Sequence, residues 1–215
     1  MPSTAPANSS EIADPVEALY RQLAPAYDLI YGLVLHPGRR AAITRMALTP
    51  GERVLEVGVG TGLSAVMYPE WANVVAVDFS REMLARARAR LQRRDIRNVH
   101  LMEGDATSLQ LDAGSFDVVY APYVINVVHK PADVAREMRR VCRPGGRVIF
   151  LNHFRSDGAL HGRVHDALDA LVMAKAGVRW NLRLADVLDA ARLDPLTIEK
   201  VNVPRFSSLV VCTPA

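Results

Sequence analysis

The hydrophobic positions of this chain follow two periods in turn, and the alternation predicts a parallel α/β fold. Short apolar runs of strand length are separated by stretches in which apolar residues recur every three or four positions. The predicted strands cover residues 53–57, 74–78, 98–102, 116–121 and 146–153. The predicted helices lie before and between them, ending near residue 47 and covering 80–94 and 131–141. Such an order favours right-handed βαβ units, helices on both sheet faces, and ligand sites at the carboxyl ends of the strands.

The N-terminal segment carries a pattern of its own. Residues 1–10 contain little that can be buried, so we expect a disordered tail. The run Asp14-Pro15-Val16-Glu17 is a helix-start signal, and the apolar stripe after it predicts a helix over 14–34 that Pro25 breaks or kinks midway. Two interpretations of the region 11–36 stay open. It packs on the domain as a lid over the ligand, or part of it also lies on a lipid surface, although its near-neutral charge does not support a strongly basic membrane helix.

The remaining chain predicts one domain over residues 11–215. A turn is expected at His36-Pro37-Gly38, before the first helix of the domain. Residues 155–192 are expected to be helical and polar. Two short apolar runs at 197–202 and 207–212 predict a final β-hairpin.

Composition fits this picture and narrows the class of protein. The chain has 215 residues, of which 50% are hydrophobic, and this suits one globular domain with a sizeable core. The net charge is +3, and arginine clusters at 86–97 and 136–147 are interpreted as solvated helix faces, with attraction to anionic surfaces as the alternative. Cys142 and Cys212 lack a C-x-x-C spacing, which favours buried free thiols. Without a signal peptide or an apolar run of about 18 residues, we expect a cytoplasmic protein.

A glycine-rich turn after the first predicted strand is the strongest chemical signal. Gly58, Gly60 and Gly62 alternate there, and glycines let the backbone turn sharply and come close to a ligand. The dinucleotide fingerprint G-x-G-x-x-G would need a glycine where Leu63 stands, which argues against NAD. Asp78 ends the second predicted strand twenty residues after Gly58, where a carboxylate can accept both hydroxyls of a ribose. The pattern therefore predicts a nucleoside-containing ligand at the strand edge.

Further signals follow in order, and together they resemble a known family. They are the run Glu103-Gly104-Asp105-Ala106, the strand 116–121, and Arg143-Pro144-Gly145-Gly146 before the fifth strand. Over residues 40–155 the chain resembles the class I S-adenosylmethionine-dependent methyltransferases. The resemblance implies a Rossmann-like sheet of seven strands in the order 3-2-1-4-5-7-6, with the seventh antiparallel. It also implies S-adenosyl-L-methionine as methyl donor and S-adenosyl-L-homocysteine as product.

The same resemblance implies where the donor is bound. The implied contacts lie at the strand tips: Gly58, Gly60 and Gly62 for the homocysteine part, Asp78 for the ribose, Phe79 or Met83 for the adenine ring, Asp105 and Ala106 for the adenine amine, and Tyr120 and Ala121 for the methyl end. Tyr27 is expected beside the methyl group as well. For Glu56, two roles stay open, because it can hold a nearby backbone amide near the donor or be a satisfied carboxylate at the strand end.

A narrower resemblance concerns the methyl acceptor. Four segments look like the small bacterial phospholipid N-methyltransferases, which convert phosphatidylethanolamine stepwise to phosphatidylcholine: Ala26-Tyr27-Asp28-Leu29-Ile30-Tyr31-Gly32, Pro37-Gly38-Arg39-Arg40, Ala121-Pro122-Tyr123-Val124-Ile125 and Leu151-Asn152-His153-Phe154. Tyr-Asp segments also occur in relatives that methylate quinones. A C- or O-methyltransferase for a quinone or another small molecule is therefore the alternative, and a non-catalytic cofactor-binding protein is a second one. The intact glycines and acids count against the latter.

Aromatic and basic residues supply candidates for the acceptor site. Tyr27, Tyr31 and Tyr123 can surround a cationic ammonium group, or can simply fill the core. His153, at the end of the fifth strand, is a candidate base or amine-orienting group, since an ammonium must lose a proton before it attacks. Candidates for a lipid phosphate are Arg39, Arg40, Arg179, Arg183 and Arg205.

The expected partners follow from this assignment. They are a phospholipid substrate and the surface of the inner membrane, bound peripherally, with no nucleic acid. His161 and His165 stand four residues apart without an evident third ligand, so no metal site is expected.

Overall fold

The computed structural model describes residues 32, 34–155, 182–202 and 206–214. The predicted tail 1–10, the helix 14–34 except for Gly32 and Val34, and most of the stretch 155–192 lie outside the described residues.

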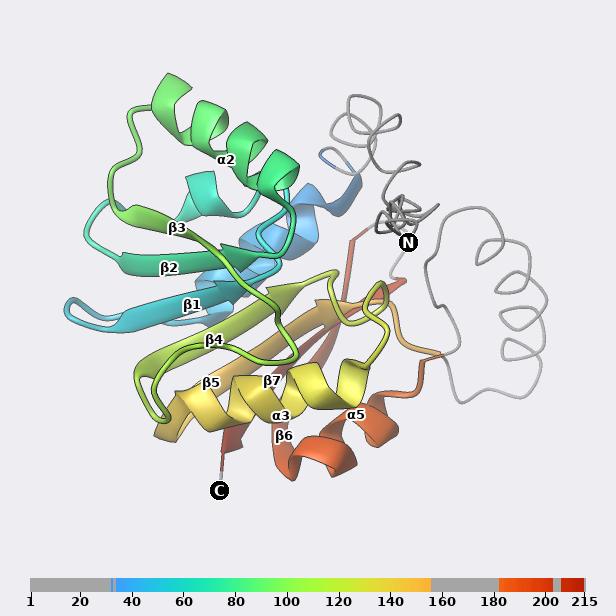
Figure 1. Ribbon diagram of the computed structural model, residues 1–215. Coiled ribbons are helices and arrows are strands. Elements are labelled where there is room, and N and C mark those ends of the chain that lie inside the picture. Colours follow the sequence, from blue (N-terminus) through green and yellow to red (C-terminus); the bar gives the residue numbers. More distant parts are fainter. Residues whose placement is uncertain (1–31, 33, 156–181, 203–205, 215) are drawn as a thin grey trace, which may run out of the picture.

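A single seven-stranded sheet organises the described chain, in the order β3-β2-β1-β4-β5-β7-β6 (Figure 1). The strands are β1 (Arg53–Val57), β2 (Asn73–Asp78), β3 (Val99–Glu103), β4 (Phe116–Pro122), β5 (Cys142–Asn152), β6 (Leu193–Val201) and β7 (Ser207–Pro214). The first five strands pair in parallel, whereas β7 is antiparallel to both β5 and β6. This confirms the implied strand order and the C-terminal hairpin.

Helices cover the two faces of the sheet and form two hydrophobic layers. The described helices are one at residues 34–45, the short η1 (Ala65–Met67), α2 (Arg81–Arg93), α3 (Pro131–Val141) and α5 (Leu184–Ala191). α3 and α5 lie on one face in Figure 1, where Leu55 and Phe150 are buried beneath them. Val54 and Ile149 are buried in the opposite layer with residues of the helix 34–45 and α2. Neighbouring residues of one strand are thus buried in opposite layers, because successive side chains of a strand point to opposite faces of the sheet.

Local signals determine where α2 begins. The Ser80 hydroxyl accepts a hydrogen bond from the Met83 N–H at 3.3 Å, so Ser80 is the N-cap that the sequence predicts. Glu82 lies in the first turn, where a negative charge is favourable. The start of this helix is therefore fixed directly after the tip of β2.

Several predicted boundaries are wrong, among them the start of β6, which is Leu193 rather than residue 197. Residues 34–45 form one helix through His36-Pro37-Gly38, because Gly38 is buried and donates its N–H to Asn202 Oδ1 at 2.7 Å. Packing on the hairpin thus outweighs the weak helix propensity of proline and glycine. Strand β5 begins at Cys142 rather than at residue 146. Residues 143–146, expected before this strand, form a bulge inside it, since Phe116 pairs with Cys142 but Val118 pairs with Arg147.

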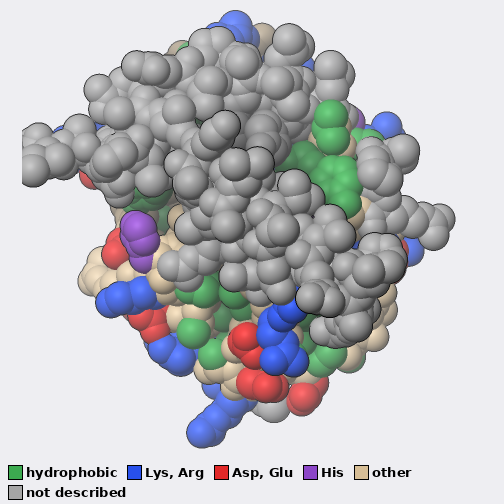
Figure 2. All heavy atoms as spheres, turned by 90° about the vertical axis from the view of Figure 1, so that its right-hand side faces the viewer, with side chains coloured by type: hydrophobic (Ala, Val, Ile, Leu, Met, Phe, Trp, Pro, Cys, Tyr) green, Lys and Arg blue, Asp and Glu red, His purple; other side chains and the backbone are tan. Residues whose placement is uncertain are grey.

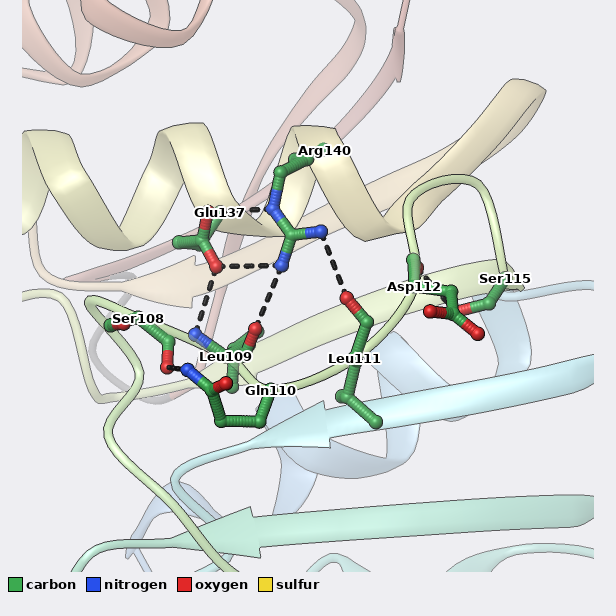
Figure 3. Close-up of polar contacts among 8 residues, drawn as sticks. All are labelled: Ser108, Leu109, Gln110, Leu111, Asp112, Ser115, Glu137 and Arg140. Carbon is green, nitrogen blue, oxygen red and sulfur yellow. Dashed lines mark hydrogen bonds and ion pairs between the residues drawn. The ribbon is translucent and has the colours of Figure 1, made fainter.

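The loop between β3 and β4 is held by side chains of α3 (Figure 3). Arg140 donates hydrogen bonds to the carbonyl oxygens of Leu109 and Leu111, each at 2.8 Å. Glu137 accepts the Leu109 N–H at 2.8 Å and pairs with Arg140, which holds the pKa of the Glu137 carboxyl below its usual value. These bonds anchor the loop whose first residues reach the functional site.

Both cysteines are buried and free, as predicted. Burial raises the pKa of each thiol to about 12, so neither is a reactive thiolate near neutral pH.

Glu56 is a fully buried carboxyl group near the end of β1, paired in register with Tyr120 of β4. Burial raises its pKa to about 7, and the hydroxyls of Tyr68 and Ser64 offset this only in part. Within the described residues neither carboxyl oxygen has a hydrogen bond of good geometry. The folded protein therefore favours the protonated form of this side chain.

A pH dependence of stability follows from this carboxyl. The pKa of this carboxyl is 4.5 in the unfolded chain and about 7 in the folded protein. Between these two pH values the unfolded carboxyl is ionised and the folded one is protonated, so folding takes up a proton. Relative to Glu56→Gln, the wild-type protein should lose about 3 kcal/mol of unfolding free energy between these two values. Urea unfolding of both proteins from about pH 4 to about pH 8 measures this difference. A difference that stays constant with pH would contradict the assignment.

Candidate functional site

A cavity of about 630 Å³ lies at the carboxyl ends of β1 to β4. Its walls are the turns that follow these strands, the start of α2, and Arg39 from the helix 34–45. Figure 2 views the side of the molecule toward which these strands point, with some hydrophobic side chains in view and most of the visible acidic and basic side chains in the lower half. The position agrees with the rule that ligands of parallel sheets bind outside the carboxyl ends of the strands.

The three glycines after β1 have three different roles. All have positive φ angles, and a Cβ at Gly60 would meet nothing within 4 Å, although Gly60 lines the cavity. A Cβ at Gly58 would lie 2.1 Å from Val124, so this glycine lets the turn after β4 pack closely. A Cβ at Gly62 would lie 3.2 Å from Ala87 of α2, and Gly62 does not line the cavity. Its place is therefore helix packing, and not the ligand contact that was expected.

Asp78 joins the tip of β2 to the glycine turn. Its Oδ2 accepts the Gly60 N–H at 2.7 Å and its Oδ1 accepts the Ser80 N–H at 3.0 Å. Burial raises the pKa of this carboxyl, and these backbone hydrogen bonds partly oppose the shift. Asp78 lines the cavity, and each carboxylate oxygen has a second lone pair for the hydroxyls of a ligand.

The residues implied for an adenine ring also line the cavity. They are Phe79, Met83, Asp105 and Ala106. The Phe79 side chain is 73% exposed, so its ring is open to a ligand. Asp105 is held in place by Thr107, whose N–H and hydroxyl both donate to Asp105 Oδ1 at 2.8 Å.

At the tip of β4 the structure corrects the prediction. Tyr120 and Ala121 are completely buried and do not line the cavity, because β4 continues to Pro122. Tyr123 takes their place on the wall, and its N–H donates to the Leu151 carbonyl at 2.6 Å. Its φ of 59° is rare for a residue with a side chain, and such strain is concentrated at functional sites. Glu56 does not line the cavity either, and its carboxyl is buried behind it.

Behind Tyr123 the structure brings together His153 and two residues that sequence analysis missed. Asn202 donates hydrogen bonds through Nδ2 to Tyr123 Oη at 2.9 Å and to Ser207 Oγ at 2.7 Å. Ser207 Oγ lies 3.1 Å from His153 Nδ1. The His153 ring packs 5.4 Å from the ring of Tyr123 and 5.0 Å from that of Phe206. His153 is 8% exposed and does not line the cavity.

A sequence signal for Asn202 does exist. It is a polar residue at the end of a predicted strand, just before Pro204, and asparagine tolerates the left-handed conformation found there, with φ at 69°.

The arginines that are candidates for binding a lipid phosphate differ in their position relative to the cavity. Arg39 is 6% exposed and lines the cavity, with its guanidinium carbon 4.9 Å from the centre of the Tyr123 ring. Arg40 is exposed and does not line the cavity, and Arg183 is exposed just before α5. Four candidates lie outside the described residues: Tyr27, Tyr31, Arg179 and Arg205.

The described residues contain neither a cluster of metal ligands nor a membrane-spanning helix. In this part of the chain, no three His, Cys, Asp or Glu side chains lie close enough to hold a metal ion, and His161 and His165 fall outside it. No helix of the same part has both the length and the apolar character needed to cross a membrane.

Comparisons with known proteins agree with this geometry. A family model described as a methyltransferase domain matches residues 55–150. A phosphatidylethanolamine N-methyltransferase from Cereibacter sphaeroides is 41% identical over 156 residues, which are 72% of this chain and 76% of the relative. A demethylmenaquinone methyltransferase from Renibacterium salmoninarum is 35% identical over 142 residues, 63% of this chain and 57% of the relative.

A solved structure shows the same fold. Phosphoethanolamine N-methyltransferase 2 from Haemonchus contortus, in complex with S-adenosyl-L-methionine, has a TM-score of 0.72 at 23% identity and covers 91% of this chain and 48% of that chain. The cavity fits the cofactor of this family, because a side chain at Gly60 would enter it and Asp78 offers acceptors for ribose hydroxyls. The fold, the cavity and the relatives together show that the chain belongs to the Rossmann-like, S-adenosylmethionine-dependent methyltransferases.

Proposed function

We propose that this methyltransferase methylates the amine of phosphatidylethanolamine stepwise toward phosphatidylcholine, bound peripherally at the inner membrane surface. The observation that carries the proposal is the 41% identity to a phosphatidylethanolamine N-methyltransferase over 72% of the chain. The quinone relative is less similar, at 35% over 63% of the chain. Attachment of the region 11–36 to the lipid surface is part of the same proposal.

The proposed donor site is the wall formed by the turns after β1, β2 and β3. There Gly58 and Gly60 admit the homocysteine part, Asp78 accepts the ribose hydroxyls, and Phe79 and Met83 flank the adenine, with Asp105 and Ala106 at its amine. The bound cofactor supplies an electrophilic methyl group on its sulfonium. The protein contributes by orienting this group toward the acceptor, which can account for much of the rate enhancement.

The proposed acceptor site lies at Tyr123 and Arg39. The Tyr123 ring lies 4.9 Å from one cation already, that of Arg39, and an aromatic face attracts cations such as a lipid ammonium. The Arg39 guanidinium can bind the phosphate of the same headgroup in a bidentate manner. His153 contacts the back of this site through Tyr123 and Ser207, so we assign it the orienting role rather than direct proton abstraction.

A quinone acceptor is the second candidate. The demethylmenaquinone methyltransferase relative supports it, and a flat quinone ring can stack on the Tyr123 ring. A quinone carries no phosphate, so Arg39 could serve it only as a hydrogen-bond donor to a ring oxygen. The two candidates therefore differ in what they demand of this arginine.

The acceptor class is tested directly with purified protein and labelled methyl donor. Vesicles containing phosphatidylethanolamine should take up label, and mass spectrometry should show monomethyl and then further methylated lipid. Vesicles of phosphatidylglycerol without ethanolamine lipid are the control. Label on a demethylated quinone in the same vesicles, with none on phosphatidylethanolamine, would refute the proposal and establish the second candidate.

The donor site is tested by binding of S-adenosylhomocysteine. Gly60→Val fills the cavity with a side chain, and Asp78→Ala removes hydrogen bonds to two hydroxyls, so calorimetry should show an affinity loss of about 100-fold for each. Gly51→Val is the matched control, because Gly51 has φ at 94° and open space around it but does not line the cavity. It should lower the melting temperature and keep the affinity. Wild-type affinity in both cavity variants would refute this site.

Neighbouring arginines test the phosphate site. Arg39→Ala should raise the KM for phosphatidylethanolamine vesicles about 10-fold or more, through loss of a charge-assisted hydrogen bond in a partly dry site. Arg40→Ala removes the same charge from an exposed position of the same helix and should leave KM unchanged. Equal effects of the two substitutions would mean that general membrane attraction, and not a phosphate site at Arg39, is responsible.

A further inference from the structure

Asn202 lies directly after β6, and its side-chain amide is a junction between three parts of the chain. Its Oδ1 accepts the N–H of Gly38 in the helix 34–45 at 2.7 Å. Its Nδ2 donates to Tyr123 Oη, in the turn after β4, at 2.9 Å and to Ser207 Oγ of β7 at 2.7 Å. The residue is 6% exposed.

The three hydrogen bonds fix the orientation of the Asn202 amide. An asparagine side chain has one carbonyl oxygen and two N–H groups, and here the oxygen and both hydrogens have partners. A buried amide that is bound in this way has a single favourable orientation, and loss of one partner leaves a costly buried polar group.

Gly38 makes the junction tight. A Cβ at this position would lie 2.8 Å from both Asn202 Oδ1 and Tyr123 Oη, so the helix backbone itself rests against the amide and the phenol. Arg39, which lines the cavity above the Tyr123 ring, is the next residue of the helix. The position of Arg39 therefore depends on the same contact as the position of Tyr123.

We propose that Asn202 is a positioning residue that holds Tyr123 and Arg39 in their places on the acceptor wall. The inference rests on the proposed acceptor role of these two residues. Asn202 itself does not line the cavity, so it acts through its neighbours. The hydrogen bond that it donates also lowers the pKa of the Tyr123 phenol, against the raising effect of burial.

A second contact between the helix 34–45 and the C-terminal hairpin does not involve Tyr123, and it provides a matched control. Arg45 of the helix 34–45 forms an exposed ion pair with Glu199 of β6, with N–O distances of 2.7 and 3.1 Å. Arg45→Gln thus removes a contact between this helix and the hairpin far from the amide. Asn202→Gly removes the amide while tolerating the φ of 69° at this position.

The first measurement does not depend on any acceptor. The protein is labelled with 3-fluorotyrosine, and the fluorine resonance of Tyr123 is identified by its absence in Tyr123→Phe. In Asn202→Gly this resonance should shift, while the affinity for S-adenosylhomocysteine stays within about twofold of the wild type. In Arg45→Gln the resonance should not move. An unshifted Tyr123 resonance in a cooperatively folding Asn202→Gly protein would overturn the proposal.

The second measurement uses phosphatidylethanolamine vesicles. Asn202→Gly should raise KM about 10-fold with little change in kcat, and should add little to the defect of Tyr123→Phe, because the two act through one contact. Additive effects would overturn the proposal, as would an unchanged KM. If the wild type methylates no lipid, the proposed function fails, and the resonance and donor affinity still decide whether Asn202 positions Tyr123.

A second variant covers the case in which Asn202→Gly does not fold. Asn202→Asp keeps an acceptor for the Gly38 N–H, and the hydroxyls of Tyr123 and Ser207 can turn to donate to it. It should therefore show a smaller KM increase and a Tyr123 resonance closer to that of the wild type. A KM defect of Asn202→Asp with a wild-type Tyr123 resonance would overturn the proposal.

Discussion

The hydrogen bond from the Gly60 N–H to the Asp78 carboxylate is the contact on which the donor side of the molecule depends. It joins the turn after β1 to the tip of β2 at 2.7 Å. The N–H groups of Gly58 and Val59 strengthen the same junction by donating to the Val77 carbonyl at 2.7 and 3.0 Å. A buried carboxylate is costly unless backbone donors surround it, and the glycine turn supplies such donors because its residues accept positive φ angles. The charge and the turn therefore stabilise one another.

The proposed donor wall, formed by the turns after β1, β2 and β3, and the proposed acceptor wall, formed by Tyr123 and Arg39, are built in different ways. The donor wall comes from turns that follow strands of the sheet, and its central hydrogen bond joins Gly60 to Asp78, 18 positions apart. The acceptor wall comes from distant parts of the chain, and its central contact joins Gly38 to Asn202, 164 positions apart. Long-range contacts of this kind form only when the sheet is complete, so the acceptor wall depends on the whole fold.

This difference explains how far the sequence could predict the structure. The strand order, the Ser80 cap and the cavity residues Gly60 and Asp78 were predictable, because each follows from a local pattern or a family motif. The helix through Pro37 and Gly38 was not predictable, because Gly38 packs against Asn202, which is 164 positions away in the sequence. Tyr123 was expected at the acceptor, but the resemblance also implied Tyr120 and Ala121 at the methyl end, and the apolar pattern does not show that β4 continues to Pro122 and buries them. Asn202 and Ser207 belong to no motif, and the position of Asn202 at a strand end does not show that the two residues meet Tyr123 and His153.

The proposed acceptor site takes its residues from inside and outside the matched methyltransferase domain. The family model spans residues 55–150, which contain the proposed donor site and Tyr123, whereas Arg39, His153 and Asn202 lie outside that span on both sides. Changes in the flanking segments can therefore alter the acceptor without disturbing the binding of the methyl donor. The relatives of this chain bear names with a phospholipid in one case and a quinone precursor in another, over one shared domain. Residues before and after the matched domain are then positions at which relatives with the same methyl donor can differ in the acceptor.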